Sequence, residues 1–200
     1  MIDAVGLIVV VPVCAALIVV TALQWSLIDS LTPFGYYPLL LGLWALWFLV
    51  GIGALVTYLV RRPRRLGSAL PMLVCVATFF VLVFVPVTAI QAKIDFRAHR
   101  VEREALVARV LSGELAVDDG LVALGPQEPR LSRGGNEVAV EKVGSGSYVL
   151  FFAVRGVLDN YSGYLWVPSG GDPRSFWDLS ESESCEIKRY DDHWYWVAHW

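Results

Sequence analysis

Charged residues are scarce in the first part of this 200-residue sequence. Residues 1–92 contain only six, Asp3, Asp29 and four arginines, whereas residues 93–200 contain 29. Hydrophobic residues nevertheless make up 56% of the chain, above the roughly 45–50% of soluble domains. We therefore expect the excess of apolar side chains to lie in lipid, and a domain boundary to fall near residue 92.

Cysteine and positive charge are also limited. Cys14 and Cys75 lie in apolar runs, which leaves Cys185 as the one cysteine of residues 93–200, so that part cannot form a disulfide of its own. Its 12 Lys and Arg stand against 17 Asp and Glu, a net charge of −5. Such a domain lacks the basic face that a phosphate backbone requires, and nucleic acid is excluded as a partner.

Motifs for catalysis and metal binding are missing. The sequence has no phosphate-binding loop, HExxH, GxSxG or paired-carboxylate spacing. His193 and His199 fall on one predicted strand six residues apart, about 20 Å, too far to share a metal ion. We expect no catalytic residue, no metal and no cofactor.

Three long apolar runs are present: Val5–Leu23, Tyr37–Val60 and Leu70–Ala92, of 19, 24 and 23 residues. As helices they measure about 28, 36 and 34 Å, against a hydrocarbon core of about 30 Å. None contains an ionisable Asp, Glu, Lys, Arg or His, which favours an anchor or assembly surface over a transporter. Pro86 is expected to bend the third helix near its end.

Four positive charges set the expected orientation. Arg61, Arg62, Arg64 and Arg65 lie between the second and third runs, and the positive-inside rule places this loop in the cytoplasm. The N-terminus is then cytoplasmic, residues 24–36 form an outer loop, and the C-terminal domain is extracytoplasmic. The alternative for the first run, a cleaved signal peptide, is disfavoured because no Lys or Arg precedes it.

Residues 93–113 predict a juxtamembrane helix continuous with the third run and ended by Gly113. Apolar residues recur along it at steps of three and four: Ile94, Ala98, Val101, Ala105, Ala108 and Leu111. We expect this row to pack on the sheet of its own domain. Pairing with another subunit in a coiled coil is the alternative, disfavoured by fewer than three heptads.

Residues 114–200 predict a small antiparallel β meander with turns at 134–136, 144–146 and 159–160. The expected strands are 121–124, 137–143, 147–155, 161–167, 185–190 and 194–200, with residues 169–184 as the longest loop. The fold class is thus membrane α-helical, with three transmembrane helices plus a small extracytoplasmic α+β domain.

Many aromatic residues occur in this β domain, and Trp194, Trp196 and Trp200 should share one strand face. They indicate either a packed core or a protein-binding face, with a carbohydrate or lipid platform as a third alternative. Arg155 and Asp159 could pair across a hairpin turn. The possible interaction surface consists of Arg155, Asp159, Tyr161, Tyr164, Trp166, Trp177, Trp194 and Trp196.

The expected function is therefore that of a non-enzymatic integral membrane protein. Its β domain would serve protein–protein interaction, with a separate partner or a second copy of the chain, or make it an accessory subunit of an envelope complex. The alternative is a membrane-anchored ligand-binding domain or enzyme, with a site near residues 155–164 and His193.

Overall fold

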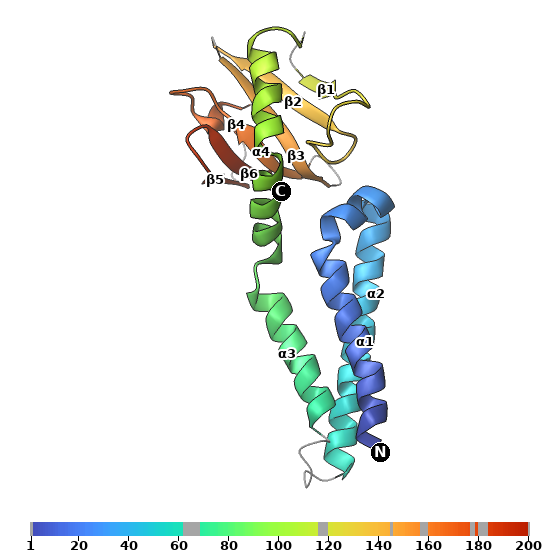
Figure 1. Ribbon diagram of the computed structural model, residues 1–200. Coiled ribbons are helices and arrows are strands. Elements are labelled where there is room, and N and C mark those ends of the chain that lie inside the picture. The colour runs from blue at the N-terminus through green and yellow to red at the C-terminus, as the bar shows by residue number, and fades with distance from the viewer. Residues whose placement is uncertain are drawn as a thin grey trace. The chain divides into compact units, whose positions relative to one another are not determined.

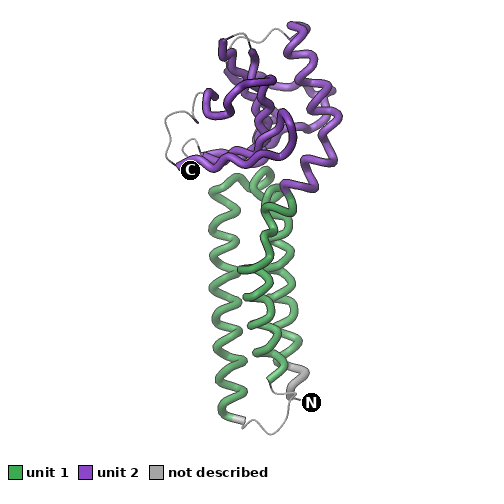
Figure 2. Tube along the Cα trace, turned by 90° about the vertical axis from the view of Figure 1, so that its left-hand side faces the viewer, with its two compact units in different colours: residues 1–91 green, residues 92–200 purple. Residues whose placement is uncertain are grey.

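The computed structural model describes residues 2–61, 69–115, 120–144, 146–156, 160–176, 179 and 184–199. The chain divides into two compact units, Met1–Gln91 and Ala92–Trp200 (Figure 2). The first unit is helical, and the second combines most of one helix with an antiparallel sheet of six strands. The chain therefore joins a helical part to a β domain.

The helical unit contains α1 (Ile2–Ala22), α2 (Gln24–Arg61), α3 (Leu70–Phe84) and the first turns of α4 (Val87–Leu111). Helices α1 and α2 run side by side, and α3 lies closest to them at its N-terminal end and diverges toward its C-terminal end (Figure 1). Val10 and Cys14 of α1 pack with Cys75 of α3, and Trp47 and Val50 of α2 lie against them. This small apolar cluster holds the three helices together.

The segment 24–36, predicted as an outer loop, is helical. The Leu27 N–H donates to the Leu23 carbonyl at 2.9 Å, so helical bonding continues almost through the junction of α1 and α2. Helix α2 breaks only at Thr32, where φ is 59°. Pro33 follows this break, a position where its missing N–H costs nothing because the first turn of a helix has no intrahelical acceptor.

The third apolar run is both interrupted and bent near Pro86, as predicted: α3 and α4 meet at an angle of 55°. Helix α3 ends at Phe84 and α4 begins at Val87, six residues before the predicted start of the juxtamembrane helix. Pro86 has no N–H to continue the bonding of α3, but its carbonyl accepts from the Ile90 N–H at 3.0 Å and so opens α4. Gly113 has φ 74°, which confirms the predicted left-handed stop.

All six predicted strands are confirmed, each with its described ends within one residue of the prediction. They are β1 (Gly120–Ala123), β2 (Glu137–Val143), β3 (Gly146–Arg155), β4 (Tyr161–Trp166), β5 (Cys185–Arg189) and β6 (Trp194–His199). A short 3₁₀ turn, η2 (Pro173–Ser175), lies in the long connection between β4 and β5.

The predicted meander holds only as far as β4. The order in the sheet is β1-β2-β3-β4-β6-β5, so β6 is inserted between β4 and β5. Strand β6 is buried on both faces from Trp196 to Ala198, whereas β5 carries Lys188 and Arg189, both exposed. An interior position suits β6, and charged side chains suit an edge strand because they oppose pairing with another chain.

Both faces of the sheet are covered. Helix α4 lies across one face (Figure 1), with its Phe96 ring 5.5 Å from that of Trp194. On the other face, Phe176 and Leu179 from the β4–β5 connection are fully buried against residues of β3, β4 and β6. A sheet covered on both sides explains why its central strands are apolar on both faces.

Candidate functional site

A buried charged cluster lies between α4 and the sheet. Arg103 of α4 is only 2% exposed. Its Nη2 donates to Asp95 Oδ2 at 2.7 Å and to the Leu131 carbonyl at 3.0 Å, and its Nε donates to the same carbonyl at 3.2 Å. The charge is thus paired and hydrogen-bonded, as a buried guanidinium must be.

Tyr164 of β4 completes this cluster. The Arg103 guanidinium carbon lies 4.3 Å from the centre of the Tyr164 ring, within the range of a cation–π contact. The Tyr164 hydroxyl donates to the Ala92 carbonyl at 2.7 Å. Burial raises the pKa of Tyr164 above its ordinary value, and the Asp95 charge adds to this effect. The hydroxyl therefore stays protonated near neutral pH and acts as a structural donor.

Aromatic rings surround the cluster. Phe96 of α4 contacts the rings of Tyr164, Tyr190 and Trp194 at centroid distances of 5.4, 5.3 and 5.5 Å. Tyr164 also meets Trp196 edge-on at 5.3 Å. The cation–π contact, the hydrogen bonds and the ring packing together attach α4 to the sheet, while the Arg103–Asp95 pair lies within the helix. The contacts of this cluster therefore serve to hold the β unit together.

Four residues of the predicted interaction surface are in fact core residues. Tyr161, Tyr164, Trp194 and Trp196 are buried. The register pairs Tyr164 with Trp196 and Trp166 with Trp194, so Trp194 and Trp196 do share a face, as predicted. Trp200, the third predicted member of that face, lies outside the described residues. That face lies under α4, because its rings supply the apolar contact that the helix needs, and it is not an exposed surface.

The remaining predicted surface residues are dispersed. Trp166 is half-buried and stacks on His193 at 5.5 Å. Arg155 pairs with Glu137 of β2 at 2.6 Å and lies 4.9 Å from the Phe152 ring. Asp159 and Trp177 lie outside the described residues, so the predicted pair between Arg155 and Asp159 stays a prediction.

Arg155 and His193 of the alternative ligand site lie near opposite ends of β4 in the described structure. Arg155 pairs with Tyr161 at one end of β4, whereas His193 contacts the Val167 carbonyl beyond the other end. Strand geometry separates these ends by about 17 Å. Among the described residues no three His, Cys, Asp or Glu side chains come together as a metal site would require.

The apolar row predicted to pack on the sheet points the other way. Ile94 and Val101 are 64% and 75% exposed, and the four remaining members, Ala98, Ala105, Ala108 and Leu111, are exposed as well. The buried face of α4 is formed instead by Ala92, Phe96, Arg103, Leu106, Val107 and Val110. Arg103 lies at the centre of this face. Because it is charged, apolar spacing alone did not identify the face as buried.

Within the helical unit, an apolar groove of about 340 Å³ lies between α2 and α3. Trp47, Phe48 and Leu55 line it from α2, and Met72 and Phe79 from α3. Its lining includes no charged side chain, so it offers neither a counter-ion nor a proton relay.

The membrane orientation expected from four arginines stays a prediction. Arg61 ends α2, and Arg62, Arg64 and Arg65 lie outside the described residues. Comparison with known protein families, curated proteins and solved structures gives no match to this chain.

Proposed function

We propose that this chain is a non-enzymatic integral membrane protein that crosses the bilayer three times and holds its β unit on the extracytoplasmic side. The β unit serves protein–protein interaction, as part of a homo-oligomer or as an accessory subunit of an envelope complex. The observation that carries this proposal is the exposed surface of the helical unit.

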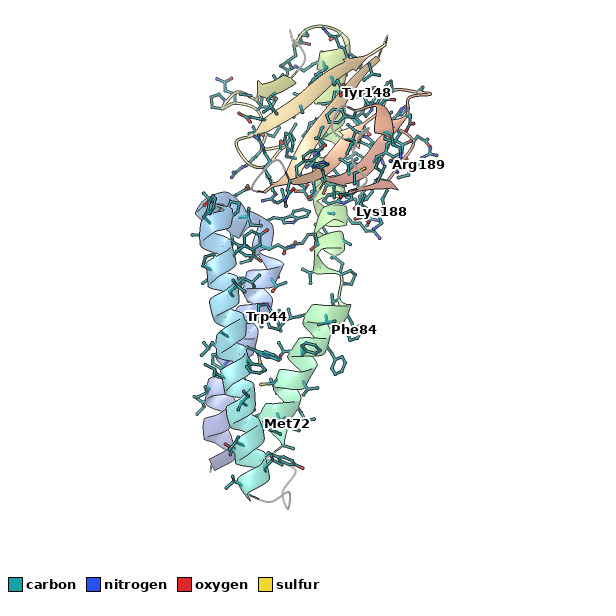
Figure 3. All side chains as sticks on the ribbon, turned by 180° about the vertical axis from the view of Figure 1, so that it is seen from behind. Trp44, Met72, Phe84, Tyr148, Lys188 and Arg189 are labelled. Carbon is teal, nitrogen blue, oxygen red and sulfur yellow. The ribbon has the colours of Figure 1, made fainter. Side chains whose placement is uncertain are left out.

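That surface is apolar along all three helices. Large hydrophobic side chains more than 60% exposed include Ile8, Leu41, Phe48, Leu49, Val60 and Phe84. Figure 3 shows carbon atoms predominating around α1–α3, with Met72 and Phe84 among them, whereas nitrogen and oxygen atoms are frequent on the β unit. Exposing an apolar surface of this extent to water is unfavourable, whereas contact with lipid favours it.

Helix lengths support the crossings. The part of α2 from Gln24 to Val60, which includes the break at Thr32, is among the described residues the one helix long and apolar enough to span on its own. Helix α1 has 21 residues, about 31 Å. Helix α3 has only 15, about 22 Å, so the third crossing also needs the interruption at Pro86 and the first turns of α4.

The interruption at Pro86 is compatible with lipid because polar groups nearby find partners. The Val85 N–H donates to the Val81 carbonyl at 3.0 Å. Gln24 donates to Thr88 at 2.9 Å and to Gln91 at 3.1 Å, and Gln91 in turn donates to the Ala22 carbonyl. Such contacts between helices hold a bundle together in a membrane.

Membrane orientation is tested with single cysteines in the full chain, labelled in intact cells by a membrane-impermeant maleimide. In a background with the native cysteines replaced, Arg130→Cys in the β unit should be labelled from outside. Arg64→Cys should be labelled only after the cells are opened. Labelling in the reverse order, or recovery of the chain in the soluble fraction, contradicts the proposal.

Partner binding is tested by purifying the full chain from its native membrane in mild detergent after crosslinking. We expect either a stoichiometric second protein or a homo-oligomer. A crosslinker-treated chain that remains a monomer contradicts the interaction role, even where the membrane orientation is as proposed.

A further inference from the structure

We infer that α4 pairs in parallel with α4 of a second copy of this chain, through the exposed row Ile94, Ala98, Val101, Ala105 and Ala108, here called the outer stripe. This inference deepens the proposed function, since it rests on both copies sitting in one membrane. The partner is a second copy of the chain, and the contact is the face of α4 turned away from the sheet.

The outer stripe has the spacing of a coiled-coil seam. Its steps are four, three, four and three residues, which place Ala98 and Ala105 at a positions and Ile94, Val101 and Ala108 at d positions of a heptad. Ile94 and Val101 are the large side chains of the stripe and are 64% and 75% exposed. The alanines between them allow two helices to approach closely.

The outer stripe lies opposite the face that binds the sheet. In the same heptad Phe96, Arg103 and Val110 occupy f, the position farthest from the a and d seam. All three are buried in the β unit. A second helix can therefore cover the stripe without disturbing the packing of α4, and each sheet would lie on the outer side of the helix pair.

Charges beside the stripe are complementary in a parallel pair. Position g of one helix faces e of the next heptad on the other helix. Arg97 at g would thus face Glu102 of the second copy, and Glu104 at g would face Arg109. Two-fold symmetry repeats both opposite-charge pairs on the other side of the seam.

Arg97 and Glu102 are the more informative pair. Both are exposed, and within the described part of the chain neither forms an ion pair, so pairing between copies displaces no contact of theirs. Glu104 already binds Arg100 at 2.8 Å, and Arg109 binds Glu128 at 2.6 Å. These two would share or exchange existing partners.

Two features reduce the cost of so short a seam. Isolated helices of this length are marginal in water, but α4 is already held by the sheet, so pairing does not have to order it. Both copies enter the membrane in the same orientation under the proposed topology, which presents the two α4 helices in parallel and confines them to one plane.

Crosslinking in membranes tests the contact. Val101→Cys, in the full chain with its native cysteines replaced, should form a disulfide-linked dimer on oxidation with copper phenanthroline. Lys93→Cys, also exposed but at position c on the flank of α4, should stay at the level of the cysteine-free chain. Equal crosslinking at both positions, or none at Val101, overturns the inference.

Charge exchange tests the identity of the partner. In the Val101→Cys chain, Arg97→Glu should reduce the dimer, because the introduced carboxylate would then face the carboxylate of Glu102. Adding Glu102→Arg should restore the dimer, because opposite charges face each other again. If the partner were a different protein, exchanging the two charges within this chain would not restore the crosslinked dimer. A double variant that does not regain the dimer therefore overturns pairing between copies.

Two controls separate the possible failures. Val101→Glu should abolish co-purification of differently tagged copies, while Leu121→Glu, an equal charge change at an exposed leucine of β1, should leave it unchanged. Near-UV circular dichroism should be the same for both variants. Loss of the dimer in a chain that keeps its membrane orientation refutes this inference alone, whereas an altered orientation refutes the proposed function.

Discussion

Arg103 shows what a single buried charge contributes in this chain. It is held by Asp95, the Leu131 carbonyl and the Tyr164 ring, all within the β unit. Removing one partner of a buried pair is costly because the other charge stays desolvated. Asp95 and Arg103 both lie on α4, so their pair neutralises the buried face of the helix, whereas the Leu131 carbonyl and the Tyr164 ring connect that face to the rest of the unit.

We expect Arg103→Met to lower the free energy of unfolding by about 3 kcal/mol, because Asp95 loses its closest partner. Arg100→Met on the same helix is the matched control. Arg100 is 45% exposed, so its ion pairs with Glu104 and Asp191 should contribute less than about 1 kcal/mol. Denaturant unfolding of the detergent-solubilised chain, followed by near-UV circular dichroism, measures both; equal losses would contradict this account.

Tyr164 predicts a loss of stability in alkali. Burial, with the charge of Asp95, raises the pKa of Tyr164 in the folded chain, whereas an unfolded tyrosine ionises at about pH 10. The unfolded state therefore releases its proton first. The contribution of the protonated Tyr164 to the free energy of unfolding is fully present below pH ~10 and is lost as the pH rises beyond it.

Tyr164→Phe should flatten this decline above about pH 10, and at pH 7 it should cost about 1 kcal/mol for the lost hydrogen bond to Ala92. Unfolding midpoints at several pH values measure both effects. Burial also raises the pKa of Tyr190, so some slope will remain. An unchanged slope in the variant would show that Tyr164 is not the group responsible.

At the scale of elements, the end of α4 depends on a glycine. Gly113 has φ 74°, and no atom lies within 4 Å of the position that a Cβ would take, so only the backbone conformation opposes a side chain there. Gly113→Ala should destabilise the chain by about 1 kcal/mol. Gly125 is a matched control, since its surroundings are equally open and its φ is not left-handed.

Gly125→Ala should be neutral or stabilise by up to about 1 kcal/mol, because it reduces the freedom of the unfolded chain. The two alanine variants should therefore differ in the sign of their effect on the unfolding midpoint. The same loss at both positions would mean that steric contact, not backbone conformation, decides the outcome.

Strand positions followed from the sequence because turn residues bound each strand closely, as Gly144 does between β2 and β3. Strand order did not, since alternation reports which faces are buried and not which neighbour is paired. The charges of β5, Glu186, Lys188 and Arg189, were the available signal that this strand belongs at an edge.

The orientation of α4 was wrong for a related reason. A reading of apolar spacing favours Ile94, Ala98 and Val101, which recur regularly, over a face interrupted by Arg103. The buried face is decided by the Phe96 ring, which packs on Trp194, and by Asp95, which neutralises Arg103. Such pairing is visible only once the chain is folded. Four residues predicted to lie on a surface proved to be buried for the same reason, because their partners are known only in the folded chain.

At the scale of the whole molecule, the two units present different surfaces to their surroundings. Leu49 on α2 is 65% exposed among other exposed apolar residues, whereas Leu121 on β1 is a 50% exposed leucine of the β unit. Under the proposed topology, Leu49 lies near the middle of the second crossing and faces lipid.

Leu49→Lys should oppose insertion of this helix by about 2.5–3.5 kcal/mol. A fraction of the molecules would then carry the β unit on the cytoplasmic side, because one crossing is lost. Leu121→Lys should leave the orientation unchanged. Maleimide labelling of Arg130→Cys in intact cells measures the fraction, and equal labelling in the two lysine variants would contradict the assignment of α2.

The two opposed faces of α4 also bear on how such a sequence can change over evolutionary time. Substitution at positions 96, 103 and 110 is limited by packing against the sheet, and substitution at positions 94, 98 and 101 is limited by pairing through the outer stripe. Drift should therefore be confined to narrow flanks of the helix. If two copies pair there, residues 97 and 102 should reverse sign together among descendants of this chain, a covariation that contacts within one copy do not require.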